Sequence, residues 1–95
     1  MNFKDNIRIL MVDKPLKLDC GETINNYPIA YETYGKLNKN KDNAILVFHA
    51  LSGDQFVTGI NPVTNKSGWW SHAVGPNKAV DTNKYFVICA NVMGG

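Results

Sequence analysis

The sequence predicts an α/β fold in which strands lie parallel within one sheet. Residues 44–48, Ala-Ile-Leu-Val-Phe, form a short apolar run that leads into His49 and a small polar turn. Such a run, bounded by turn residues, is typical of a strand buried on both faces of a parallel sheet. A second apolar run, Tyr85 to Val92, follows after 35 residues, which is long enough for the crossover that parallel strands require.

Two further strands are expected earlier in the chain. Lys14 to Cys20 alternates loosely in polarity and stops at Gly21. Tyr27 to Tyr34 alternates with a period of two and is rich in residues that favour strands. Because the residues between these segments are typical of a turn, the two strands are expected to pair as a hairpin.

The remaining segments are expected to connect the strands. Gly35 to Asn43 is predicted to be a loop that leads into the strand Asn43 to His49. The crossover, Ala50 to Lys84, contains Pro62 and Pro76 and has no clear helical stripe of apolar residues. Within it, the best candidate for a short helix is Trp69 to Val74.

Composition fits one small globular domain and gives no indication of nucleic acid as a partner. The chain has 95 residues, of which 44% are hydrophobic, and its net charge is +2. Three lysines, Lys36, Lys39 and Lys41, are interleaved with asparagines. This stretch favours a solvated loop, since a phosphate-binding patch needs a denser basic face.

No targeting, membrane or metal signal stands out. No apolar run is long enough to span a bilayer, and the first eleven residues lack the features of a signal peptide, so we expect a cytoplasmic location and no membrane partner. Cys20 and Cys89 are 69 positions apart and are not expected to form a disulfide. His49, Asp54 and His72 match no metal-ligand spacing, so neither a metal nor a bound cofactor is expected.

Candidate site residues follow the two apolar runs, where ligands collect in open α/β sheets. Gly53 is expected to permit a tight turn after the first run, and Asp54 to anchor that turn by accepting backbone N–H bonds. Asn91 lies at the end of the second run, where a binding loop would start. Trp69 and Trp70 are expected either to line a pocket or to cover a sheet edge.

Several segments, taken in order, resemble the homoserine O-acyltransferase family, whose members have the α/β-hydrolase fold. The matching segments are Ala30 to Asn38 (AYETYGKLN), His49 to Asp54 (HALSGD), Gly68-Trp69-Trp70, Val74-Gly75-Pro76, Asp81-Thr82 and Tyr85 to Gly95 (YFVICANVMGG). The resemblance implies that residues 1–95 are the amino-terminal portion of a single α/β-hydrolase domain. They would form about four strands of an incomplete sheet and end before the nucleophile elbow.

The resemblance also implies a reaction and a role for Leu51. Family members transfer an acetyl or succinyl group from coenzyme A to the hydroxyl of L-homoserine, in methionine biosynthesis. In this pattern the backbone N–H of Leu51 supplies half of an oxyanion hole. The family's triad histidine comes near the carboxyl terminus, so His49 is expected to fix the loop through a ring hydrogen bond. The segment Gly59 to Pro62 is a candidate for choosing among acyl donors or acceptors.

The catalytic triad of the family maps onto no position of this chain. Ser52, Ser67 and Ser71 lack the strand-to-helix elbow of a nucleophile, and Cys89 is expected to be a small buried core residue. The chain alone is therefore expected to be inactive. It would bind homoserine and acyl-coenzyme A only if completed by the missing part, and it is expected to self-associate or to pair with a downstream polypeptide.

Two alternatives remain open from the sequence. A hydrolase of the same fold would use the same loop with water as the acyl acceptor. A non-catalytic remnant or interaction module would keep the sheet without any reaction.

Overall fold

The computed structural model describes residues 8–93, and these contain eight strands and no helix. No segment in this range forms a helix that is long and apolar enough to cross a membrane. The strands are β1 (Arg8–Val12), β2 (Leu16–Lys17), β3 (Thr23–Ile24), β4 (Tyr27–Tyr34), β5 (Ala44–Val47), β6 (Val74–Gly75), β7 (Val80–Asp81) and β8 (Phe86–Ala90).

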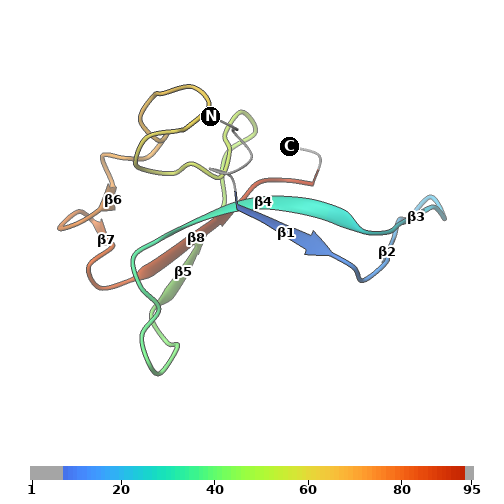
Figure 1. The fold of residues 1–95 in the computed structure, drawn as a ribbon, viewed down its shortest axis with the longest axis horizontal. Helices are drawn as coiled ribbons and strands as arrows, with labels where there is room; N and C mark the ends of the chain where they lie inside the picture. The colour runs from blue at the N-terminus through green and yellow to red at the C-terminus, as the bar shows by residue number, and fades with distance from the viewer. Residues whose placement is uncertain (1–7, 94–95) are drawn as a thin grey trace.

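Four strands form one mixed sheet in the order β1-β4-β8-β5 (Figure 1). β5 and β8 run parallel, with Val47 opposite Cys89, whereas β4 runs antiparallel to both of its neighbours. This sheet confirms the predicted parallel pair. The residues between β5 and β8 form the crossover, which includes the short pair β6 and β7.

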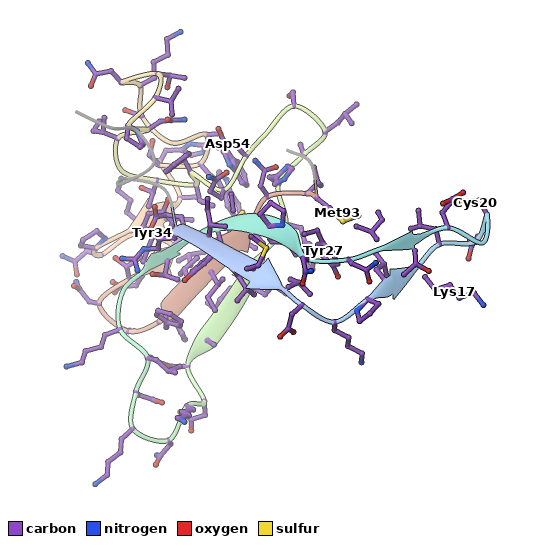
Figure 2. The ribbon with its side chains drawn as sticks, turned by 45° about the vertical axis from the view of Figure 1, so that its right-hand side comes forward. Lys17, Cys20, Tyr27, Tyr34, Asp54 and Met93 are labelled. Atoms are coloured by element: carbon purple, nitrogen blue, oxygen red, sulfur yellow. The ribbon has the colours of Figure 1, made fainter. Side chains whose placement is uncertain are left out.

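The segment Lys14 to Cys20 was predicted to pair with β4, and this prediction was wrong. Residues Arg8 to Val12 pair with β4, with Arg8 opposite Tyr31 and Val12 opposite Tyr27. The segment Lys14 to Cys20 contributes only β2, which pairs with β3 to form an arm that extends beyond the sheet (Figure 1). The hairpin is therefore longer than expected, and its turn lies at the tip of the arm, near Cys20 in Figure 2.

The predicted helix at Trp69 to Val74 is a set of turns. The N–H groups of Ala73 and Val74 both donate to the Trp70 carbonyl, which makes a single helical turn before β6 begins. In a segment this short, the few helical hydrogen bonds do not offset the unfavourable free energy of helix nucleation. Its residues instead pack the crossover onto the sheet.

The core lies on one face of the sheet, between β5, β8 and the crossover. Four side chains are completely buried: Val57, Val74, Val87 and Cys89. Val47 joins them, and Tyr34, Ile45 and Val80 pack against the cluster. The prediction that Cys89 is a small buried core residue is confirmed.

The prediction that β5 is buried on both faces was wrong for this chain. Ile45 and Val47 pack into the core, but the alternate side chains are open to solvent, with Leu46 58% and Phe48 82% exposed. The reason is that the crossover covers only one face, and no segment among residues 8–93 covers the other. β5 is also the last strand in the order, so its outer edge carries unpaired backbone groups.

We predict that the 95-residue chain associates in solution through this open face and edge. Phe48→Lys should lower the associated fraction, because a charge on an exposed edge opposes pairing with another chain. Val63→Lys is the matched control, since Val63 is 56% exposed but lies in the crossover. The measurement is light scattering over a range of concentrations together with a thermal melt. A monodisperse monomer with a sharp cooperative transition would contradict the prediction.

A second prediction concerns Tyr34, whose hydroxyl oxygen is buried and has no hydrogen-bond partner within residues 8–93. Burial raises the pKa of Tyr34 from 10.0 to about 12; the Glu32 carboxylate adds to this rise, and the nearby N–H groups of Thr58 and Val57 oppose it without closing a hydrogen bond. A raised pKa favours the neutral phenol in the folded chain. The resulting stability is complete below pH 10 and is lost as the pH rises toward 12.

Tyr34→Phe should leave the stability at neutral pH unchanged or slightly higher, because it removes a buried hydroxyl that makes no hydrogen bond. It should also reduce the alkaline loss of stability. Unfolding in urea from neutral pH to pH 12 tests both effects. A large loss of stability at neutral pH would show that the hydroxyl has a partner.

Candidate functional site

The candidate site lies where β5 and β8 end. Because the two strands are parallel, the residues that follow them meet at the same edge of the sheet. A hollow of about 230 Å³ opens there, between the strand ends. Its lining residues are Leu46, Val47, Phe48, His49, Ala90, Asn91 and Val92.

Directly after β5 the chain makes a tight turn over Ala50 to Gly53. The Gly53 N–H donates to the Ala50 carbonyl at 2.8 Å, which closes a four-residue turn with glycine in its last position. Leu51 is fully exposed, and its N–H donates to no acceptor within the described part of the chain. The predicted oxyanion donor is therefore free to bind a ligand oxygen.

His49 braces this turn, as the sequence predicted. Its ring Nδ1 lies 2.7 Å from the Ala50 carbonyl oxygen, within hydrogen-bond distance. Its Nε2 atom is buried and has no partner among residues 8–93. Gly53 packs against the same residue: a Cβ atom on Gly53 would lie 2.9 Å from the His49 Cβ, closer than side chains normally approach. The turn therefore has room for glycine alone at this position.

Asp54 connects the turn to the crossover. Its Oδ1 accepts the Phe56 N–H at 2.9 Å, which is the expected backbone anchor, and its Oδ2 accepts the Asn61 side-chain amide at 3.3 Å. Its backbone carbonyl accepts the indole N–H of Trp69 at 2.9 Å. In Figure 2 Asp54 lies above the sheet, among the turns of the crossover.

Trp69 and Trp70 form a stacked pair beside Asp54. Their ring centroids are 5.9 Å apart and their planes differ by 7°. Just before them, the Gly68 backbone lies against the backbone of Thr58: a Cβ atom on Gly68 would lie 2.3 Å from the Thr58 nitrogen. Trp69 lines a second hollow of about 190 Å³, together with Ser52, Gly53, Asp54, Phe56, Asn61, Thr64, Lys66, Ser67 and Gly68. Of the two roles expected for the tryptophans, this position favours a pocket wall.

One polar residue of the site, Gln55, was missed in the sequence, and Asn61 was predicted only as part of the segment Gly59 to Pro62. Gln55 is 4% exposed, and its Oε1 accepts the Asn91 side-chain amide at 3.0 Å, which ties the loop after β5 to the loop after β8. Asn61 is 8% exposed, and its Oδ1 accepts the N–H groups of Val63 and Thr64. Asn61 therefore shapes the segment Gly59 to Pro62 and joins it to Asp54.

The residues of this site do not form a nucleophile and base. Ser71 donates to the Gly68 carbonyl, and within the described range no serine or cysteine side chain is hydrogen-bonded to a histidine ring. Burial, and secondarily the Asp54 charge, raises the pKa of the Cys89 thiol, so this residue stays protonated. His72 is exposed. No cluster of three candidate metal ligands occurs in residues 8–93.

Solved structures define the class of this sheet. Esterase E22 matches 90% of the chain with a TM-score of 0.79 and 31% identity, and 23% of that chain is covered. A homoserine O-acetyltransferase from Bacillus anthracis matches 90% of the chain with a TM-score of 0.78 and 37% identity, and 22% of it is covered. The sheet is thus the amino-terminal part of an α/β-hydrolase sheet.

The sequence comparison narrows the class to a family, although no family profile matches the chain. The homoserine O-acetyltransferase of Pelagibacter ubique is 74% identical over all 95 residues, which cover 26% of that protein. That of Nitrobacter hamburgensis is 61% identical over 83 residues, 87% of this chain and 21% of that protein. The chain is therefore closely similar to the amino-terminal region of homoserine O-acetyltransferases, and it spans about a quarter of their length.

We predict that the carboxylate of Asp54 stabilises the loop after β5. Asp54→Ala should lower the free energy of unfolding by about 1–3 kcal/mol, because two buried or half-buried donors lose their acceptor. Asp54→Asn should cost less, since it retains an oxygen for the Phe56 N–H. Denaturant unfolding measures both, with the exposed Asp19→Ala as the control. Equal effects of the alanine and asparagine variants would contradict the role of the oxygen.

Proposed function

We propose that these residues supply the amino-terminal part of the acyl-transfer site of a homoserine O-acetyltransferase. The observation that carries the proposal is the 74% identity over the whole chain to a homoserine O-acetyltransferase. The unpaired Leu51 N–H at the edge where β5 and β8 end supports it independently.

In the proposed reaction the chain stabilises charge rather than attacking the substrate. A serine outside residues 1–95 takes the acetyl group from acetyl-coenzyme A and passes it to the hydroxyl of L-homoserine. In each step the carbonyl oxygen of the acyl group becomes negative in the tetrahedral intermediate. The Leu51 N–H donates to that oxygen, and one such donor is worth about 3–4 kcal/mol of barrier.

The neighbouring residues would then shape the substrate pocket. Gly53 and Asp54 hold the turn, and Trp69, with Trp70 stacked on it, provides an aromatic wall. Asn91 fixes the loop after β8 through Gln55. We also propose that the Gly59 to Pro62 segment, held by Asn61, contributes to the choice of acyl donor or acceptor.

The cellular setting is part of the same proposal. We assign the reaction to methionine biosynthesis and to the cytoplasm. Both assignments rest on the similarity to homoserine O-acetyltransferases.

A hydrolase is the second candidate, because an esterase shares the sheet with a TM-score of 0.79. Such an enzyme would use the same N–H donor with water as the acceptor. The sequence favours the transferase, since the relatives that are 74% and 61% identical to this chain are both homoserine O-acetyltransferases. The reaction product separates the two: O-acetylhomoserine for the transferase and acetate for the esterase. A non-catalytic interaction module would give neither.

The proposed function predicts activity in a hybrid enzyme. In this hybrid the 95 residues replace the aligned region of the Pelagibacter ubique relative. The hybrid should form O-acetylhomoserine from homoserine and acetyl-coenzyme A. The 95-residue chain alone should not exceed the buffer rate, because residues 8–93 bring no serine or cysteine together with a histidine ring as base. Turnover by the chain alone, or a folded but inactive hybrid, would contradict the proposal.

Leu51→Pro in the hybrid tests the N–H donor. Proline removes this N–H, and the second position of a tight turn accepts proline well. The variant should lower kcat by about 10²- to 10³-fold, which is the usual effect of losing one oxyanion donor. Leu51→Ala retains the N–H and should have a far smaller effect. Equal losses in the two variants would show that the side chain matters, not the donor.

A further inference from the structure

The Leu51 N–H and the Ala50 carbonyl belong to one peptide unit, so their directions are linked. No cis peptide occurs in the described chain. In a planar trans peptide the N–H points away from the C=O of the same unit. Whatever holds the Ala50 carbonyl therefore also aims the Leu51 N–H.

Two donors hold that carbonyl. The Gly53 N–H reaches it at 2.8 Å, and His49 Nδ1 lies 2.7 Å from it. Both contact the oxygen of the Ala50–Leu51 peptide, so the Leu51 N–H points to the opposite side of that peptide. One hydrogen bond alone would let the peptide plane swing about that contact, whereas two fix it.

We propose, on the basis of the proposed function, that His49 is a positioning residue that aims the oxyanion-binding N–H of Leu51. It acts through the Ala50 carbonyl and does not touch the substrate. A carbonyl oxygen only accepts hydrogen bonds, so Nδ1 carries a hydrogen. In the neutral ring Nε2 is then a bare acceptor, and this is the buried atom without a partner in residues 8–93.

The close contact with Gly53 explains how the ring keeps its place. The Gly53 backbone lies against the His49 Cβ with no space for a methyl group between them. The same glycine thus donates to the Ala50 carbonyl and limits the position of the histidine that donates beside it. Residues 49, 50, 51 and 53 act as one unit, and this unit leaves the Leu51 N–H without an acceptor in residues 8–93.

The side-chain geometry provides a matched pair of variants. His49→Asn places an amide N–H close to the position of Nδ1, whereas His49→Gln places its amide one bond farther out, near Nε2. In the hybrid, the asparagine variant should retain kcat within about threefold. The glutamine variant should lower kcat by about 10- to 100-fold, the size of effect that a misplaced catalytic group produces. The KM for acetyl-coenzyme A and the melting temperature should stay nearly constant, since substrate binding and folding do not depend on the direction of the Leu51 N–H.

His72→Gln is the control, because it makes the same change at an exposed histidine outside the site. Equal kcat values for the asparagine and glutamine variants, at any level, would overturn the positioning role. A crystal structure of each variant hybrid provides a readout that does not depend on activity. The Ala50–Leu51 peptide should keep its direction in the asparagine variant and rotate in the glutamine variant. An inactive wild-type hybrid would refute the proposed function, whereas an unrotated peptide in the glutamine variant would refute the role of His49.

Discussion

The parallel pairing of β5 with β8 is the constraint on which the rest of the structure depends. It requires a crossover, and the crossover supplies Val57 and Val74 to the core over Val87 and Cys89. It also brings the ends of both strands to one edge, so that residues 36 positions apart in sequence meet as the Gln55 and Asn91 side chains. Core and site are thus products of the same pairing: the buried face fixes the strands, and the fixed strands place their following loops.

The site is built mainly from backbone groups, and this determines how its residues function. Asp54, Asn61 and His49 each engage main-chain atoms one or two residues further along the same loop, by hydrogen bonds or by a ring nitrogen at hydrogen-bond distance. Their side chains set the direction of peptide units instead of reacting themselves. Two glycines of the site allow close packing: Gly53 lies against His49 within the turn, and Gly68 lies against Thr58 within the crossover. Such a framework is suited to stabilising charge that develops on a bound group.

The sequence predicted those features that depend on apolar runs and on local turn chemistry. The runs at residues 44–48 and 85–92 identified the parallel pair, and the Gly53-Asp54 sequence identified the anchored turn. It did not identify β1, because Ile9, Leu10 and Met11 are consecutive apolar residues, all more than half exposed, with no alternation to indicate a strand. Nor did it reveal the Gln55–Asn91 contact, since a polar pair distant in sequence has no periodic signal. Burial of β5 was overestimated because an apolar run shows what a strand can bury, not what covers it.

The one-sided core has a consequence for the order of folding during synthesis. A ribosome adds about 5–20 residues each second, so the amino-terminal part of a domain emerges before the rest. In the Pelagibacter ubique relative this region makes up 26% of the protein. The remaining residues therefore take on the order of tens of seconds to emerge. During that interval the face that carries Leu46 and Phe48 is available to any apolar surface nearby. Chaperone binding to the nascent chain would shield the face until later segments arrive, so the least protected stage of this sheet precedes completion of the polypeptide.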